Sequence, residues 1–127
     1  MVESEKMEEN MERNYECMLI LRPDLPEAER EKAASQIGEK IKELKGQVKK
    51  SVLWRNLCDF YYFLRSKGAE RTKYYKGSYW LIEFTLSTEN LDDLKETIRL
   101  EESILRSLIL NKESDKVNIP ESKMQSS

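Results

Sequence analysis

The segment EESILRSLIL, residues 101–110, decides the fold of this chain. Its last seven residues are apolar apart from Ser107 and one charge, Arg106, and short apolar runs of this kind are typical of strands in a sheet. Alternate side chains of a strand lie on opposite faces, so Arg106 shares one face with Leu108, and Leu105 lies on the other. An unpaired guanidinium group beneath helices is costly. The sequence therefore predicts that Arg106 lies on a face of the sheet that no helix covers.

An apolar sheet face that carries one cation is typical of a docking surface, which is the interpretation we favour for Arg106. The alternative is structural. An arginine in an outer strand can simply prevent edge-to-edge pairing with other chains, and sheets with helices on one face often leave some leucine exposed.

The first part of the chain predicts a strand followed by a helix. Residues 15–21 form an almost wholly apolar run, which Pro23 ends because proline cannot donate to a ladder. Asp24 and Glu27 have the spacing of a capping box, and Gly46 has the position of a C-terminal helix stop. Between them, apolar residues at helical spacing form one stripe: Ala33, Ile37, Ile41 and Leu44.

The middle of the chain predicts two strands. Residues 47–63 are rich in β-branched and aromatic side chains and indicate one strand, bent around residues 56–59. Residues 64–77 are polar and bounded by glycine, which predicts a long, mobile connection. Residues 78–86 indicate the next strand, whose core-facing side chains are Trp80, Ile82, Phe84 and Leu86.

A second helix precedes the last strand, and three residues can cap it: Ser87, Thr88 or Asn90. The order is then β-α-β-β-α-β, and right-handed crossovers fold it into an α+β domain of the ferredoxin-like, split β-α-β class. This class has a four-stranded antiparallel sheet with both helices on one face, and its outer strands are the second and the last. We expect the domain at 14–113, between an acidic flexible extension at 1–13 and a flexible tail at 114–127.

Charge is distributed unevenly along the chain. The net charge is −2 and the pI is about 5.4, but residues 46–80 carry +6, whereas residues 1–16 and 81–127 carry −4 each. Binding to phosphate depends on which cations touch it. An acidic total therefore does not exclude a nucleic-acid partner for the basic middle of the chain.

Composition narrows the classes of function that are open to this chain. The chain has no histidine, the commonest general base and metal ligand, and Cys17 and Cys58 lack metal-binding spacing and are expected to act as small hydrophobes. No apolar run is long enough to span a membrane, and the acidic start resembles neither a signal nor a transit peptide. We expect a cytoplasmic protein with no catalytic residue, cofactor, metal or small-molecule substrate.

Three stretches of the sequence resemble one family, bacterial ribosomal protein S6 of the small subunit. YECMLILRPDL at 15–25 is similar to the family's first strand, and KGSYWLIEF at 76–84 is similar to its third. LEESILRSLILNK at 100–112 resembles the end of its last helix and its last strand, and there Arg106 falls on the family's arginine. The likeness covers roughly residues 14–113.

The second strand departs from the family's pattern. WRNLCDFYYF keeps Arg55 and Leu57 but has a different sequence where the family has Ala-Tyr-Pro, namely Cys58, Asp59 and Phe60. The stretch from Gly46 to Gly77 is also several residues longer than usual.

The resemblance implies a structural protein of the cytoplasmic ribosome, which binds the central domain of small-subunit ribosomal RNA together with ribosomal protein S18. It implies that Arg106 contacts a phosphate or a partner carboxylate through paired hydrogen bonds, and that Arg55 matches a second family arginine. Tyr15 is expected to present its ring and hydroxyl at the binding surface.

Basic and aromatic residues interleave in KYYKG, which suits contact with RNA through charge and stacking: Lys73, Tyr75 and Lys76. The alternative is a solvated hairpin whose tyrosines shield the sheet edge. For DFYYF, residues 59–63, packing in the core and at the edge is favoured over a platform for bases.

Three other functions compete on the same fold. An RNA-recognition motif needs Lys/Arg-Gly-aromatic-Gly/Ala-aromatic in its third strand, and this chain has Ser78 and Tyr79 where the first ring and the small residue belong. An acylphosphatase-like enzyme needs a glycine-rich anion loop, and LRPDLPE offers Arg22 without glycine. A ferredoxin-fold dimerisation or sensing domain remains open.

Overall fold

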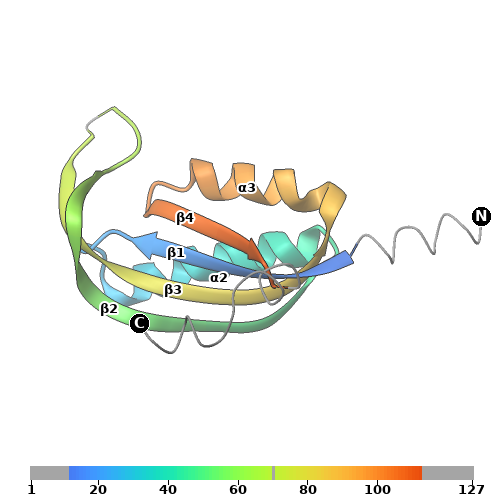
Figure 1. Ribbon diagram of the computed structural model, residues 1–127. Helices are drawn as coiled ribbons and strands as arrows, with labels where there is room; N and C mark the ends of the chain where they lie inside the picture. The colour runs from blue at the N-terminus through green and yellow to red at the C-terminus, as the bar shows by residue number, and fades with distance from the viewer. Residues whose placement is uncertain (1–11, 70, 113–127) are drawn as a thin grey trace, which may run out of the picture.

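The computed structural model describes residues 12–69 and 71–112. Four strands form one antiparallel sheet in the order β2-β3-β1-β4 (Figure 1), so the outer strands are the second and the last, as predicted. The elements are β1 (Glu12–Leu21), α2 (Glu27–Glu43), β2 (Gln47–Arg65), β3 (Lys73–Ser87), the 3₁₀ turn η1 (Thr88–Asn90), α3 (Leu91–Leu100) and β4 (Ile104–Asn111).

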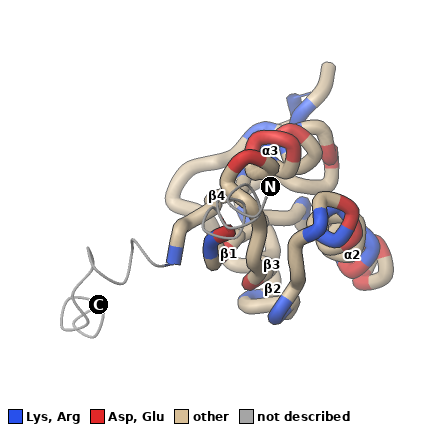
Figure 2. Tube along the Cα trace, turned by 90° about the vertical axis from the view of Figure 1, so that its right-hand side faces the viewer, with Lys and Arg blue, Asp and Glu red and all other residues tan. Residues whose placement is uncertain are grey.

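Both helices pack on the same face of the sheet. Figure 2, which looks along the strands, shows α2 and α3 beside each other on one side of them. Ile37 and Ile41 of α2 meet Leu94 and Ile98 of α3 in a single core cluster. Alternate side chains of β1 and β3 complete that cluster, all of them buried: Tyr15, Cys17, Leu19, Leu21, Ile82, Phe84 and Leu86. The predicted ferredoxin-like α+β fold is confirmed.

The register of β4 against β1 settles which face Arg106 occupies. Ile20 pairs with Arg106 and Met18 with Leu108, and paired residues share a face, so these four side chains lie opposite the core. Beyond Ile20 the register shifts and gives β4 an additional residue. Ile104 is therefore buried in the core, although simple alternation had placed it with Arg106.

The predicted cap residues hold neighbouring segments rather than helix ends. Asp24 does not cap α2: its carboxylate accepts hydrogen bonds from Arg22 and from the Tyr74 hydroxyl, each at 3.0 Å. Asn90 does not cap α3: its amide donates to the Leu44 carbonyl at 3.1 Å. Neither helix has a hydrogen bond from a side-chain cap. Both side chains serve tertiary contacts, which a local capping rule does not anticipate.

The end of α2 depends on two adjacent residues. Lys45, not Gly46, adopts the left-handed conformation, with φ of 70°. The N–H groups of Lys45 and Gly46 bind the carbonyls of Lys42 and Ile41 in a Schellman arrangement. Gly46 is required for space, because a Cβ there would lie 2.4 Å from the carbonyl oxygen of Thr85. The predicted helix end at Gly46 is confirmed, but glycine is needed there for close packing and not for a left-handed backbone.

The strand β2 is longer and more irregular than its sequence predicts. Its register against β3 shifts four times, and one shift falls between Arg55 and Cys58, around Leu57, which has a φ of 54°. The predicted bend at 56–59 is confirmed. Beyond the bend, β2 continues to Arg65, and its partner β3 begins at Lys73. The expectation of a long mobile connection at 64–77 is therefore wrong: most of it is paired, and the turn is short.

We call the part of this hairpin beyond the bend the arm, meaning residues 57–69 and 71–77. It rises at the left of Figure 1, beyond the ends of β1 and β4. Its turn is closed by two hydrogen bonds between Ser66 and Thr72, each of 2.8 Å. Gly68 and Arg71 provide the positive φ angles of that turn, 88° and 52°.

The proposed terminal segments fall largely outside the described residues. The strand β1 begins at Glu12, two residues before the expected start of the domain. Residues 1–11 and 113–127 carry the rest of the predicted extension and tail. Within the part of the chain that the structure describes, no helix combines the length and apolar content needed to cross a bilayer.

Burial gives Cys17 a pH-dependent role in stability. Desolvation raises the pKa of its thiol from 9.0 to about 12. Between these values the unfolded chain loses the thiol proton while the folded chain keeps it, so this contribution to stability falls as the pH rises. We expect the urea midpoint to drop less between about pH 8 and 10.5 in Cys17→Ala than in the unaltered chain. Cys58→Ala, the matched control, should retain the full drop, and an equal drop in all three proteins contradicts this account.

Candidate docking face and nucleic-acid interface

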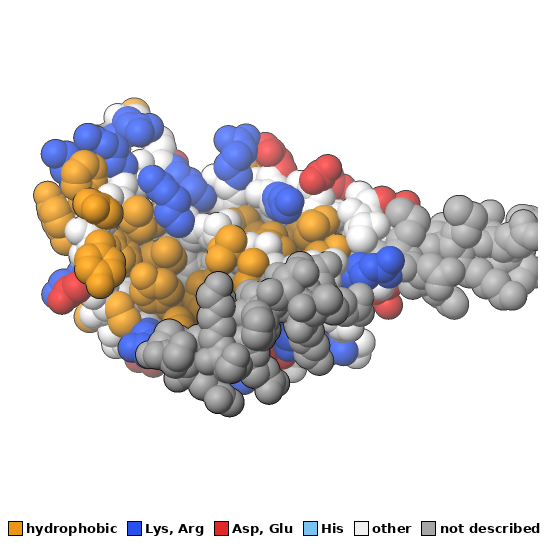
Figure 3. Space-filling model, viewed as in Figure 1, with side chains coloured by type: hydrophobic (Ala, Val, Ile, Leu, Met, Phe, Trp, Pro, Cys, Tyr) orange, Lys and Arg blue, Asp and Glu red, His pale blue; other side chains and the backbone are white. Residues whose placement is uncertain are grey.

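The sheet face opposite the helices combines apolar and charged side chains, and we call it the open face. Strand register assigns to it the apolar or aromatic residues Met18, Ile20, Val52, Tyr79, Leu81, Leu108 and Leu110 and the polar or charged residues Asn14, Glu16, Lys50, Arg55, Glu83, Thr85 and Arg106. Leu108 is 57% exposed in the outer strand β4. Figure 3, which views this side, shows hydrophobic side chains gathered at the left, with Lys and Arg above them. Exposed apolar area rimmed by charge is typical of a surface that another molecule covers.

Arg106 lies at the junction of β4 and the arm. Nη1 of Arg106 donates to the Leu105 carbonyl at 2.6 Å and to the Arg65 carbonyl of the arm at 3.4 Å. Both bonds use the same nitrogen, and a guanidinium group carries five N–H donors. Arg106 is exposed and keeps donors for a carboxylate or a phosphate.

Aromatic rings extend the open face onto β2. Trp54 and Phe60 meet the ring of Tyr79 edge-on, at centroid distances of 6.2 and 6.4 Å. The guanidinium group of Arg55 lies 5.1 Å from the Trp54 ring. Gly77 makes room for this cluster, because a Cβ there would lie 2.8 Å from Phe60. The result is a cation held on an aromatic surface, which favours binding of planar or anionic groups.

A second aromatic and basic cluster lies on the arm. The rings of Phe63 and Tyr75 meet edge-on with centroids 6.0 Å apart. Two cations lie over Phe63: Lys73 Nζ at 4.7 Å and the Arg65 guanidinium carbon at 5.1 Å. Tyr75 and Lys73 share the open-face side of β3 with Tyr79, by strand alternation. The cluster therefore continues the open face beyond the sheet.

Lys67 fixes the arm to the end of α3. Its ammonium group donates to the carbonyls of Ile98 and Glu101, at 2.9 and 3.2 Å. These carbonyls belong to the C-terminal end of the helix, where a cation is favoured. Burial lowers the pKa of Lys67, and the negative charge of Glu101 opposes this shift.

A second contact fixes the arm to the loop after β1. The Tyr74 hydroxyl donates to Asp24, and the Arg22 guanidinium lies 5.5 Å from the Tyr74 ring. The hydrogen bond from Arg22 holds the pKa of Asp24 below its ordinary value. Together with Lys67 and Arg106, this contact ties the arm to three separate elements.

The structure divides the predicted binding residues other than Tyr15 into three groups. Lys73, Tyr75 and Arg106 lie on or beside the arm and face the same side as the apolar sheet surface. Arg55 is exposed on β2, next to Trp54. Lys76 is on the opposite side of β3 and forms an ion pair with Asp59 at 3.9 Å. The interleaving of KYYKG in the sequence thus does not put its two lysines on one surface.

The expectation for Tyr15 is wrong. Tyr15 is 4% exposed and its ring stacks on Phe84 with a centroid distance of 5.6 Å. It points into the core because it alternates in step with Cys17. Sequence reasoning also missed Trp54, Phe60 and Arg65, whose facing depends on the register shifts of β2.

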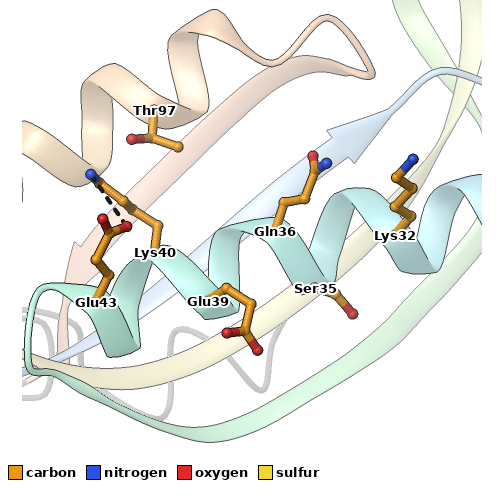
Figure 4. A pocket seen from close by; sticks show the side chains of 7 residues that line it. All are labelled: Lys32, Ser35, Gln36, Glu39, Lys40, Glu43 and Thr97. Atoms are coloured by element: carbon orange, nitrogen blue, oxygen red, sulfur yellow. Dashed lines mark ion pairs between the residues drawn. The ribbon is translucent and has the colours of Figure 1, made fainter.

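The helix side offers no comparable site. A hollow between α2 and α3 is lined by Lys32, Ser35, Gln36, Glu39, Lys40, Glu43 and Thr97 (Figure 4). Two of its charged residues, Lys40 and Glu43, form an ion pair of 3.7 Å within α2. Among residues 12–69 and 71–112 there is no group of three or more side chains suited to holding a metal ion.

Comparison with known proteins agrees with this architecture. The family model described as ribosomal protein S6 matches residues 14–111. The chain belongs to the ribosomal protein S6 family. Small ribosomal subunit protein bS6 of Thermosipho africanus is 32% identical over 95 residues, 74% of this chain and 73% of that protein. The relative from Trichlorobacter lovleyi is 29% identical over 101 residues, 78% of this chain and 75% of that protein.

A solved structure extends the family likeness to the fold. The crystal structure of 30S ribosomal protein S6 from Thermotoga maritima superposes with a TM-score of 0.69 at 30% identity. The match covers 90% of this chain and 98% of that one. The expectations of a structural small-subunit protein of the cytoplasmic ribosome, and not an enzyme, are confirmed by the family.

The contacts of Lys67 predict how firmly the arm is held. In Lys67→Met the arm loses two charged hydrogen bonds, each worth about 1.5 kcal/mol or more. We expect amide hydrogens of the arm to exchange at least about tenfold faster than in the unaltered chain, by mass spectrometry, while β1 is unchanged. Lys42→Met, an exposed helix lysine, is the control. Equal arm exchange in both variants argues against this anchoring role.

Proposed function

We propose that this chain is a structural constituent of the small ribosomal subunit that binds the central domain of small-subunit ribosomal RNA together with ribosomal protein S18. The observation that carries the proposal is the open face: an apolar sheet surface without a covering helix, bordered by exposed arginines. Membership of the ribosomal protein S6 family supports the ribosomal part of this proposal. The resemblance of the sequence to that family implies the RNA and the protein partner, and the open face is consistent with both.

The apolar part of the open face suits a protein partner. Leu81, Leu108 and Met18 form adjacent positions on three strands, and burying such side chains against another protein contributes about 25 cal/mol per Å². The acidic total charge of this chain favours a basic partner, which also supplies charge for neutralising phosphates. A small basic ribosomal protein has both properties.

The basic border of the open face suits RNA. Arg55, Arg106 and Lys73 are all exposed. Arg55 and Lys73 belong to residues 46–80, which carry a net charge of +6, and Arg106 contacts that segment at the Arg65 carbonyl. Arginine recognises phosphate through paired hydrogen bonds, and an aromatic neighbour such as Trp54 preorganises the guanidinium plane. These residues contact phosphate without reading a sequence.

Two of the three competing functions would also use the open face. An RNA-recognition motif stacks bases on rings of both central strands, whereas here the open face has Tyr79 on β3 but, among the described residues of β1, Met18 and Ile20 and no ring. Self-association through the open face is separable by salt, because apolar association tolerates salt and RNA binding does not.

Capture from a cell lysate tests the proposal directly. The tagged chain is expected to retain small-subunit RNA and one small basic protein, and the RNA should be lost steeply as salt rises. Capture of neither, or of further copies of this chain alone at all salt concentrations, refutes the proposed function.

Arg106 gives the sharpest variant. Arg106→Ala should keep its melting temperature within a few degrees, because the side chain is exposed, and should retain small-subunit RNA about tenfold less well. Arg99→Ala is the matched control, since Arg99 is an exposed arginine of α3 that pairs with Glu96. Unchanged retention in Arg106→Ala, or equal loss in both variants, contradicts the role of Arg106.

A further inference from the structure

Two tyrosines of the arm are fully presented to solvent by an irregularity in β2. Asp59 pairs with Lys76 and Leu64 pairs with Tyr74, so five steps along β2 correspond to only two along β3. Residues 60–63, which include Tyr61 and Tyr62, therefore lie opposite the single residue Tyr75 and form a large bulge. Their exposed fractions are 102% for Tyr61 and 83% for Tyr62. The sequence had favoured packing for this segment, and the structure places both rings outside the core.

Adjacent exposed rings on a strand are unusual, because an exposed tyrosine loses the free energy that burial of its ring would contribute. Bulges often redirect side chains at functional sites, and here the bulge withdraws both rings from the sheet. The neighbouring Phe63 is held differently: it contacts Tyr75 and lies under Lys73 and Arg65. The two tyrosines therefore stand beside a cluster that already combines rings with cations.

Cations outnumber acids in the sequence around the two rings. Between residues 60 and 77 the sequence has five cations, Arg65, Lys67, Arg71, Lys73 and Lys76, against one acid, Glu70. Lys67 donates a hydrogen bond to the end of α3, and Lys76 forms an ion pair with Asp59. We therefore expect Arg65, Arg71 and Lys73 to be the cations that bind an anion. Rings interleaved with cations match the bases and phosphates of a nucleic acid strand.

We propose that Tyr61 and Tyr62 form a stacking site for unpaired nucleotides of RNA, with Arg65 and Lys73 contacting the adjoining phosphates. The inference deepens the proposed function and rests on it, because it names the part of the RNA that the arm takes. Unpaired nucleotides are specified because the faces of paired bases are covered by their neighbours in a helix. A protein partner is disfavoured by the charge, because an apolar protein surface has no negative charges to pair with these cations.

The anchoring of the arm makes the site effective. Lys67, Tyr74 and Arg106 connect the arm to α3, to the loop after β1 and to β4. The bulge that carries the rings is therefore bounded before RNA arrives by two cross-strand pairs, Asp59 with Lys76 and Leu64 with Tyr74. Binding then requires less ordering than it would on a free loop, which favours affinity.

The test compares three full-length proteins: the unaltered chain, the double variant Tyr61→Leu/Tyr62→Leu, and the double variant Tyr61→Phe/Tyr62→Phe. Fluorescence anisotropy measures binding to a labelled single-stranded RNA of about ten nucleotides and to a duplex of the same sequence. Leucine keeps apolar area and removes the ring, whereas phenylalanine keeps the ring. Circular dichroism confirms that the variants fold, as expected for exposed positions.

We expect the leucine variant to bind the single strand at least about tenfold more weakly and the phenylalanine variant to bind within about threefold of the unaltered chain. Duplex affinity should be the same for all three proteins. The stacking site is refuted if the leucine variant binds as tightly as the unaltered chain, if both variants weaken equally, or if the unaltered chain prefers the duplex.

These outcomes are distinct from a failure of the proposed function. Co-sedimentation of the unaltered chain with small ribosomal subunits from lysate tests that function separately. Its absence there contradicts ribosomal assembly, whereas the three oligonucleotide results contradict the stacking site alone. A leucine variant that loses a captured protein while keeping single-stranded RNA would assign the two tyrosines to a protein contact and overturn the inference.

Discussion

Packing of α2 and α3 against each other and against one side of β1 is the constraint on which the rest of the structure depends. Ile41 and Leu94 belong to the same core cluster as Leu19, so both helices must occupy the same face of the sheet. The opposite face then has no helix to bury it. Apolar side chains on that face are exposed to water, which is unfavourable in free energy. The molecule retains leucine there, which makes sense if another molecule covers that face.

The second feature that shapes the interface is the irregularity of β2. Each additional residue in β2 increases the local bend and twist relative to β3. The far end of the hairpin consequently leaves the plane of the sheet and reaches α3, where Lys67 meets the last carbonyls of the helix. The apolar surface for a protein and the basic, aromatic surface for RNA are therefore adjacent but separately built, one on the regular sheet and one on the arm.

Regular parts of the fold could be predicted from the sequence, and irregular parts could not. Period-two patterns in β1 and β3 are uninterrupted, so the facing of Ile82 followed from alternation. The facing of Arg106 followed in the same way, because the register shift of β4 against β1 lies before it. Along β2 every register shift reverses that alternation, and only the shift at the predicted bend around residues 56–59 could be anticipated. Tyr15 was misplaced for another reason: a hydroxyl-bearing ring suits a surface and a core equally, and only its partner Phe84 decides. Asp24 had the spacing of a cap, but the distant Tyr74 competes for it.

Hydroxyl-radical footprinting of the chain, free and bound in small ribosomal subunits, tests the central claim most directly. The open face and the helix side each carry an exposed reporter: Leu108 at 57% and, at the end of α3, Leu100 at 63%. If another molecule covers the open face, oxidation of Leu108, Trp54 and Tyr79 should fall sharply on binding while that of Leu100 changes little. Unchanged oxidation of Leu108 and Trp54, with protection of Leu100 instead, would show that the subunit contacts the helices and would contradict the account.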